Sequence, residues 1–305
     1  MSGTVSINSV SQVHQSLGLP SPKHPLITVV KTDTIKDHAV FNKVKIINNL
    51  YQVAYKQGIG GNLNYGRSTY DFQDGTLIFT APGQVIEYTN DEETNGPVEG
   101  WSLVFHPDLI RKSDLAGKID RYGFFDYASN EALHLSFDEK THIEELRDKI
   151  EFEYSHNLDS HSLNLINANL ELLLDYCLRY YDRQFLSRTN LNQDLIAKFE
   201  KTLKVYYQAS KAYELGLPSI AYCANELNLS PKYLSDLLKK ETGRAAQEHI
   251  HQFLIEKDKN LLLNSTDSIS EVAYALGFEY PQHFSNLFKT KTGLSPRAYR
   301  NMNVN

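Results

Sequence analysis

Hydrophobic and polar positions follow two different periods along this chain, and the change of period divides it. Up to about residue 110, short runs rich in Val, Ile, Tyr and Phe are separated by turn signals such as Pro82-Gly83 and Asn95-Gly96-Pro97. Runs of this kind are typical of β-strands, and many short strands favour a small antiparallel barrel or sandwich. We predict six strands, over residues 26–30, 44–47, 51–55, 76–80, 85–88 and 101–105.

The period becomes helical further along. It predicts helices over 137–153 and 162–185, with Ser162 as the N-cap of the second, and then a polar link over 187–192 before a helix over 195–209. The second helix carries a stripe that is wide for covering one sheet. The stripe could lie wholly on the protein's own sheet or also pair with a second copy in a homodimer. Its residues are Leu163, Ile166, Leu170, Leu173, Leu174, Cys177, Leu178 and Tyr181.

Between Ile220 and Arg300 one short unit is written twice, fifty residues apart. The segment Tyr233-Leu234-Ser235-Asp236-Leu237-Leu238-Lys239 aligns with His283-Phe284-Ser285-Asn286-Leu287-Phe288-Lys289. Thr242-Gly243 aligns with Thr292-Gly293. The chain therefore repeats one structural element.

Each copy has the start and stop signals of two helices joined by a tight turn. In the first, a helix opens at Ser219 and ends near Asn228, and the next is capped by Ser230 with Pro231 at its first position. The matching signals in the second copy are a capping box and two glycines. Gly243 ends the second helix of copy one. In copy two, Ser268 and Glu271 have the capping-box spacing, Gly277 lies in the turn, Pro281 starts the second helix and Gly293 ends it.

Two helices meeting at such a turn form the helix-turn-helix that enters a DNA major groove. One match would serve equally well in a structural bundle. Two copies joined by a helix over about 246–263 favour DNA binding. Apolar stripes should bury one side of each second helix, at Leu234, Leu237 and Leu238 and at Phe284, Leu287 and Phe288. The expected DNA contacts on these helices are Ser230, Lys232, Tyr233, Ser235, Asp236 and Lys239, and Gln282, His283, Ser285, Asn286 and Lys289.

The stretch from Ala273 through Lys289 to Arg300 resembles the C-terminal signature of the AraC/XylS family of transcription regulators. Departures are Asn286, where many members carry Arg, and Asp258, at a position that is often small. The resemblance implies double-stranded DNA as a partner, and RNA polymerase if the protein is an activator. Residues 75–84 are similar to the strand and turn of the family's cupin-type sensors.

The expected fold class is thus α+β. An N-terminal arm over 1–23, loosely docked, precedes a cupin-like sensor barrel over 24–136 and a helical region over 137–190. An all-α double helix-turn-helix domain follows over 194–305. Net charge changes between the halves: it is −6 overall, yet 14 basic against 12 acidic residues follow from Asp194 onward. So small a basic excess indicates placed contacts and helix N-termini as well as a general field.

The sequence also argues against several chemistries. Metal-binding cupins cluster His and Glu, but His38 and His106 are isolated, and His249 and His251 lie two apart on a helix, where they point to different faces. No catalytic, cofactor or metal site is predicted, and Cys177 and Cys223 read as core residues. We expect a small organic effector inside residues 24–110, against the alternative of a fully packed interior.

Two other function classes stand beside a sequence-specific regulator. One is a metal-independent cupin-like enzyme with an appended DNA-binding module, and the other is a nonspecific architectural DNA protein. The first lacks a nucleophile or phosphate-loop motif, and the acidic N-terminal half disfavours the second. No apolar segment has the length of a signal peptide or a membrane span, so we expect a cytoplasmic protein with no membrane partner.

Overall fold

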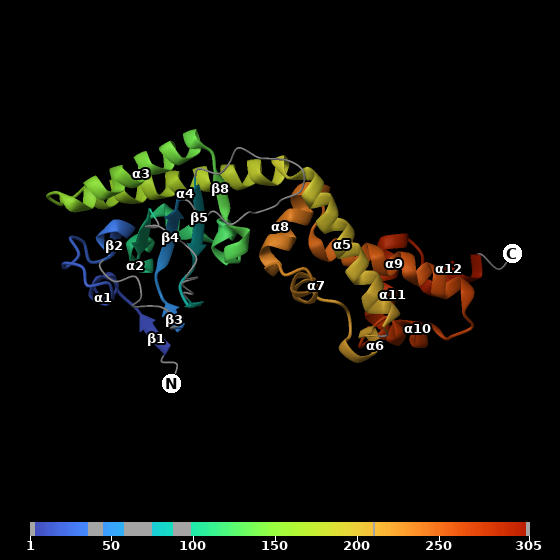
Figure 1. The fold of residues 1–305 in the computed structure, drawn as a ribbon. Helices are drawn as coiled ribbons and strands as arrows, with labels where there is room; N and C mark the ends of the chain where they lie inside the picture. Colours follow the sequence, from blue (N-terminus) through green and yellow to red (C-terminus); the bar gives the residue numbers. More distant parts are fainter. Residues whose placement is uncertain (1–3, 36–44, 58–74, 88–98, 210, 303–305) are drawn as a thin grey trace, which may run out of the picture. The chain divides into compact units, whose positions relative to one another are not determined.

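The computed structural model describes residues 4–35, 45–57, 75–87, 99–209 and 211–302. The chain divides into two compact units, Met1–Ser187 and Arg188–Asn305. Strands lie in the first unit, and the second is helical throughout its described part (Figure 1). The protein is therefore α+β, with the repeated segment in the helical unit.

The described strands of the first unit form two sheets. A three-stranded sheet has the order β1-β3-β6, and a five-stranded sheet has the order β2-β7-β4-β5-β8. All six predicted strands are present within two residues of their expected ends. The bounds are β1 Thr4–Ile7, β2 Ile27–Lys31, β3 Lys45–Asn48, β4 Tyr51–Lys56, β5 Gly75–Thr80, β6 Gln84–Glu87, β7 Gly100–Phe105 and β8 Leu133–Leu135.

These sheets differ from a purely antiparallel barrel. β1 runs parallel to β3, with Thr4 opposite Lys45 and Ile7 opposite Asn48, whereas the other pairs are antiparallel. Among the described residues the two sheets do not join into a closed barrel. A short parallel strand supplied from the N-terminus was not visible in the sequence, because its pairing partner lies about forty residues away.

Residues 1–23 are consequently not a loosely docked arm where the structure describes them. Ser9 caps helix α1, Val10–Ser16, and the Val10 side chain is fully buried. Ile7 packs with Ile46, Leu50 and Val104 in a small cluster. Strand pairing and burial together fix this segment to the sheet, which corrects the expectation from its Ser, Gly and Pro content.

Buried aromatic rings cluster in the interior of the first unit. Phe79 from β5 lies 4.3 Å from Phe124 between ring centroids, and Phe124 stacks on Tyr181 at 5.5 Å. Phe125 packs on Phe79 and Phe124, and all four side chains are buried. Phe124 and Phe125 lie in a series of 3₁₀ turns after helix α2, Pro107–Ile110. The sequence had predicted a polar connection for this stretch.

Helices α3, Phe137–Ser155, and α4, Ser162–Ser187, lie side by side along the sheet (Figure 1). Ser136 and Glu139 form a capping box that starts α3, and Tyr154 accepts a hydrogen bond from the Val29 backbone N–H of β2 at 2.8 Å. Six members of the predicted α4 stripe are buried within the unit. They are Ile166, Leu170, Leu173, Leu174, Cys177 and Tyr181.

Two details of this region correct the prediction. Ser162 is inside α4 and not its N-cap; the Asp159 carboxylate accepts hydrogen bonds from the backbone N–H groups of His161 and Ser162 at 2.8 and 3.0 Å. The polar link predicted over 187–192 is reduced to Arg188, because α4 ends at Ser187 and the next helix, α5, begins at Thr189. Leu163 on the stripe is also exposed.

The second unit packs eight helices around one core in its described residues. That core includes Phe199 and Leu203 of α5, Leu254 of the central helix and Phe284 and Phe288 of the second copy. The helix bounds are α5 Thr189–Gln208, α6 Lys211–Leu215, α7 Ile220–Glu226, α8 Pro231–Thr242, α9 Ala246–Asn264, α10 Ile269–Ala275, α11 Pro281–Thr292 and α12 Pro296–Met302. No helix in the described ranges is long and apolar enough to cross a membrane.

Candidate nucleic-acid interface

The first helix-turn-helix consists of α7 and α8. The Ser219 hydroxyl accepts a hydrogen bond from the Tyr222 backbone N–H at 3.0 Å and starts α7. The turn contains Asn228 with φ of 55°, a left-handed conformation that Asn adopts more readily than most residues. Ser230 caps α8 through the Tyr233 N–H, and Pro231 is its first residue. The predicted punctuation of copy one is confirmed.

The second helix-turn-helix consists of α10 and α11. Ser268 and Glu271 form the predicted capping box at the start of α10. Gly277 in the turn has φ of 91°, and a Cβ there would lie 2.6 Å from the Gly216 backbone. Glycine is therefore required twice over at this position, by conformation and by space. Left-handed Gly243 and Gly293 end α8 and α11 as predicted.

Three residues on the polar side of α8 are held by bonds within the helix. Lys232 Nζ lies 3.1 Å from Asp236 Oδ1 in an ion pair, and Ser235 Oγ donates to the Pro231 carbonyl at 2.8 Å. Tyr233 is only 5% exposed, so this predicted contact residue lies in the interior and not on the outer face. Lys239 is exposed.

The polar side of α11 is more open. Gln282, His283, Asn286 and Lys289 are exposed, and Ser285 is half-buried. Gln282 and Asn286 lie four residues apart, so their amides share one face of the helix. A primary amide can donate to and accept from an adenine edge at once. Both amides are thus exposed on one face in the first turns of α11.

Tyr280 is a residue of this surface that the sequence reasoning missed. It holds the N-cap position of α11 without a side-chain capping bond, is 55% exposed, and has its ring 5.4 Å from that of His283. A helix N-terminus lacking a side-chain cap keeps N–H groups and a positive dipole end available for a phosphate. The sequence feature that could have identified Tyr280 is an aromatic residue directly before Pro281, the first residue of the helix.

Helix α9 connects the two copies and agrees with the predicted 246–263 span to one residue. Its 19 residues correspond to about 28 Å at about 1.5 Å per residue. Ile250, Leu254 and Leu262 are buried in the core that both copies share. The connection is therefore a packed part of the unit rather than a free spacer.

Several cations of this unit have structural partners. Lys291 Nζ of α11 lies 3.0 Å from Glu248 Oε1 of α9, and this contact holds the pKa of the Glu248 carboxyl below its usual value. Arg300 donates to the carbonyls of Leu262 and Asp267 at 3.0 and 2.7 Å. The modest basic excess is thus partly committed to the fold, which leaves DNA contacts to individual exposed groups.

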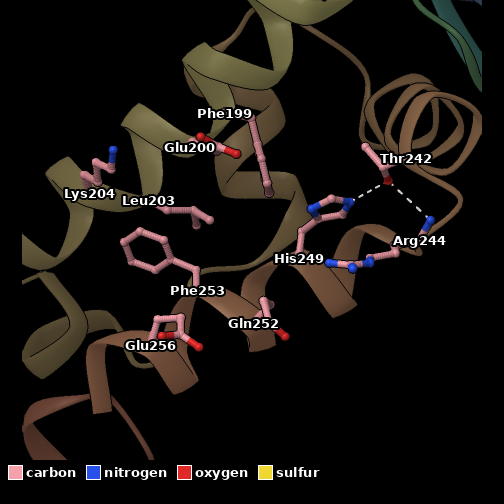
Figure 2. Close-up of a pocket in the computed structure, with 10 residues that line it drawn as sticks. All are labelled: Phe199, Glu200, Leu203, Lys204, Thr242, Arg244, His249, Gln252, Phe253 and Glu256. Atoms are coloured by element: carbon pink, nitrogen blue, oxygen red, sulfur yellow. Dashed lines mark hydrogen bonds between the residues drawn. The ribbon is translucent and has the colours of Figure 1, made fainter. Parts of the chain in front are cut away.

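A cavity of about 560 Å³ lies between α5 and α9, with Phe199, Leu203 and Phe253 as its apolar side (Figure 2). Glu200, Glu256, Lys204 and Arg244 line it with balanced charge. None of its lining residues belongs to the predicted DNA contacts, which are on other positions of α8 and α11. The remaining lining residues are Thr242, His249 and Gln252.

His249 in this cavity is a structural residue. Thr242 Oγ1 donates its proton to the Leu238 carbonyl at 2.6 Å, so it accepts from His249 Nε2 at 2.7 Å. Burial, and then the Arg244 charge, lowers the pKa of His249. Across the described residues no group of three metal-ligating side chains forms, and His38 lies outside the described residues.

The second unit matches a known domain family. The family described as "Helix-turn-helix domain" matches residues 223–302. An uncharacterized HTH-type transcriptional regulator, YobQ of Bacillus subtilis, is 37% identical over 71 residues, covering 23% of this chain and 30% of YobQ. The HTH-type transcriptional activator RhaS of Salmonella schwarzengrund is 32% identical over 133 residues, covering 44% of this chain and 46% of RhaS. The chain thus spans less than half the length of these curated relatives.

The chain also shows similarity to proteins of known structure. The C-terminal domain of AraT, a response regulator from Geobacillus stearothermophilus, is 30% identical, with 34% of this chain and 85% of that chain covered and a TM-score of 0.30. ToxT from Vibrio cholerae is 14% identical, with 92% and 98% covered and a TM-score of 0.31. Such scores are too low to establish a shared overall fold.

Two helix-turn-helix motifs on one connecting helix define a DNA-binding domain. The sequence match places that domain among helix-turn-helix domains of HTH-type transcriptional regulators, in agreement with the resemblance found in residues 273–300.

Proposed function

We propose that the chain is a sequence-specific transcription regulator, with DNA bound by α8 and α11 and with a sensor in the first unit. The observation that carries the proposal is the pair of helix-turn-helix motifs built on one core, with polar side chains on the outer sides of α8 and α11. The curated relatives that match this domain are named as transcriptional regulators. Their similarity supports the same role here.

The binding experiment uses the full chain. Sites are first selected from a random duplex pool, and affinities for a selected and a random duplex are then measured across a salt series. A sequence-specific regulator should prefer the selected duplex by about 10³-fold or more, with both affinities falling as salt rises. Equal affinities at every salt concentration would instead indicate a nonspecific architectural protein.

Roles within the interface follow from side-chain chemistry. Gln282 and Asn286 of α11 are proposed to read base edges. Lys232 is proposed to contact phosphate, although it must first leave or share its pairing with Asp236. Ser230, Ser235 and Lys239 on α8, and His283, Ser285 and Lys289 on α11, are proposed to position the helices on the backbone.

The first unit is proposed to be a cupin-like sensor for a small organic effector, without a metal. The abundance of aromatic side chains supports an effector with apolar surface, but Phe79, Phe124 and Phe125 already fill much of the described interior. His106 has a structural role, since its Nδ1 accepts from the Asp108 N–H at 3.1 Å. A stoichiometric transition metal that is lost on replacing His38 and His106 would overturn the proposal.

Two protein partners are proposed as well. A homodimer through α4 has support in Leu165 and Leu172, which are 45% and 46% exposed and lie seven residues apart on one face. Light scattering of the wild type and of a Leu172→Glu variant tests it. RNA polymerase is the proposed partner if the protein activates transcription. We propose no enzymatic activity and a division into sensor, helical and DNA-binding regions with the last beginning near residue 194.

A further inference from the structure

Asp258 is a buried acid in the middle of the connecting helix. It stands one helical turn from Leu254 and one from Leu262, both buried, in a stripe where an apolar residue would fit. Its side chain is fully buried, and neither carboxylate oxygen has a hydrogen-bond partner within the described part of the chain. A buried carboxylate without donors strongly destabilises a fold, so this position is costly whenever it is charged.

Asp258 lies where three elements meet. The Tyr207 hydroxyl of α5 donates to the Leu276 carbonyl, at the end of α10, at 3.4 Å. The Tyr207 ring lies against α9, with its centroid 5.9 Å from that of Phe253 and 4.8 Å from Nζ of Lys257, the residue next to Asp258. Burial, and then the charge of Asp258, raises the pKa of Tyr207. We call Tyr207, Asp258 and Leu276 the α5–α9–α10 junction. It joins the connecting helix to the turn of the second helix-turn-helix.

We propose that Asp258 is a proton-operated switch of this junction: protonated, it lets the three elements pack together, and ionised, it opens them and misaligns α8 and α11. The stability part of this proposal is independent of DNA. The alignment part rests on the proposed DNA-binding function. A neutral acid avoids the burial of charge, whereas an ionised one must draw in water or move toward solvent.

Other charged or titratable groups also stand around the junction, and an Asp258→Asn variant keeps all of them. Tyr207 from α5 and Cys223 from α7 both have a raised pKa, in each case mainly through burial, that of Cys223 to about 11. Lys257 of α9 lies 4.8 Å above the Tyr207 ring, and burial lowers its pKa. Arg300 of α12 is bonded to backbone carbonyls. His251, two turns before Asp258, has a pKa lowered below 6.5 by burial and then by Lys291.

The direction of the pH effect follows from proton linkage. Burial raises the pKa of Asp258 from 3.8 to about 8. Between these values the native state holds a proton that the unfolded state has lost, so stability falls as pH rises from about 4 to about 8 and then levels. The native protein itself changes charge near pH 8, and alignment of the two copies should change there.

The stability test compares the full wild-type chain with Asp258→Asn, a neutral side chain of the same shape. Melting temperatures of the second unit are measured from pH 5 to pH 8. The variant should gain roughly 5 °C on the wild type for each pH unit. Glu256→Gln, at an exposed carboxyl on the same helix, should follow the wild type. Parallel profiles for wild type and Asp258→Asn would overturn the switch.

A direct titration reports on the carboxyl of the wild-type protein itself. The ¹³C resonance of the Asp258 carboxyl, assigned by its absence in Asp258→Asn, should titrate near pH 8 in the native wild type. A midpoint near pH 4 overturns the proposal. Asp258→Leu gives a second neutral variant for the melting series if the Asn variant does not fold.

DNA affinity is then measured by fluorescence anisotropy on a selected duplex at pH 7 and pH 9. If only the protonated form aligns both helices, wild-type affinity should fall about tenfold across this range relative to Asp258→Asn. An equal pH response of the two proteins would overturn the switch even where their stabilities differ. A further outcome is that neither protein binds any duplex at either pH while their melting profiles diverge. In that case the proposed DNA-binding function is wrong, and the stability part of the proposal, a protonated Asp258 buried at the junction, is supported.

Discussion

The two helix-turn-helix copies share their backbone signals and differ in the chemistry of their outer faces. In copy one, Lys232 is paired with Asp236, and Ser235 is bonded back to its own helix. In copy two, Gln282 and Asn286 are exposed four residues apart. The fold is thus repeated while the surface is not.

From this difference we infer that the copies would contribute unequally to the proposed DNA recognition. A face whose polar groups are already bonded to one another has fewer donors and acceptors to offer base edges, and an ion pair there carries no net charge toward phosphate. Exposed amides have no such competition. We infer that α11 carries most of the base reading and that α8 mainly positions the domain.

The largest expected effect comes from breaking the link between the copies. Leu254→Pro removes a helical hydrogen bond and places a ring against the preceding turn of α9, at about 3 kcal/mol or more. A wild-type footprint should show two major-groove segments about 10 base pairs apart, and the variant should lose this pattern. Leu254→Met is the matched control and should keep it. An unaltered two-segment footprint with the Pro variant would show that α9 does not set the spacing.

A matched pair of core truncations compares the copies directly. Leu237 is fully buried as expected, whereas its counterpart Leu287 is only half-buried, which corrects the expectation that both lie on buried stripes. Leu237→Ala should reduce the free energy of unfolding by about 2–5 kcal/mol, and Leu287→Ala by less. Urea unfolding of both variants measures this. Equal losses, or a Leu237→Ala variant with wild-type stability, would contradict it.

Base reading by α11 is tested by Gln282→Ala. Losing a bidentate amide contact should relax preference at one base position by about 1–3 kcal/mol without changing the melting temperature. The matched change in copy one, Lys232→Ala, should weaken binding to all sequences alike. Affinities for duplexes substituted at each position distinguish the two. Full discrimination at every position in Gln282→Ala removes this residue from the reading role.

The smallest expected effect is at the ion pair. Asp236→Asn releases Lys232 and removes a negative charge from the α8 surface, so binding at low salt should tighten slightly. The slope of log affinity against log salt should steepen by about one. Because an exposed pair contributes at most about 1 kcal/mol to stability, the melting temperature should barely change. An unchanged salt slope would mean that Lys232 does not reach phosphate.

A structural feature could be predicted from the sequence when the residues that specify it lie close together along the chain. The caps at Ser219 and Ser230, the capping box at Ser268 and the left-handed glycines all act within four residues, and each was predicted from sequence. Helix α9 was placed to within one residue because its apolar period has no internal Pro or Gly. Six strands were found for the same reason, since alternation and turn residues are local.

Other features depend on partners far along the chain. The N-terminal strand was missed because it forms only against β3, and α5 was predicted to start too late because packing, rather than composition, extends it to Thr189. Aromatic filling of the first unit depends on Phe124 and Phe125, which stand in irregular turns outside the predicted strands. None of these partners is visible from sequence spacing alone.

The sequence by itself determined the repeated motif, the connecting helix and the class of the DNA-binding domain, because caps, turns and helical period are encoded within a few residues. Only the tertiary structure decided that Tyr233 points inward and that the Asp258 carboxylate is buried without a hydrogen-bond partner among the described residues. Burial and pairing depend on which surfaces meet when distant helices pack, and that information is spread over the whole unit.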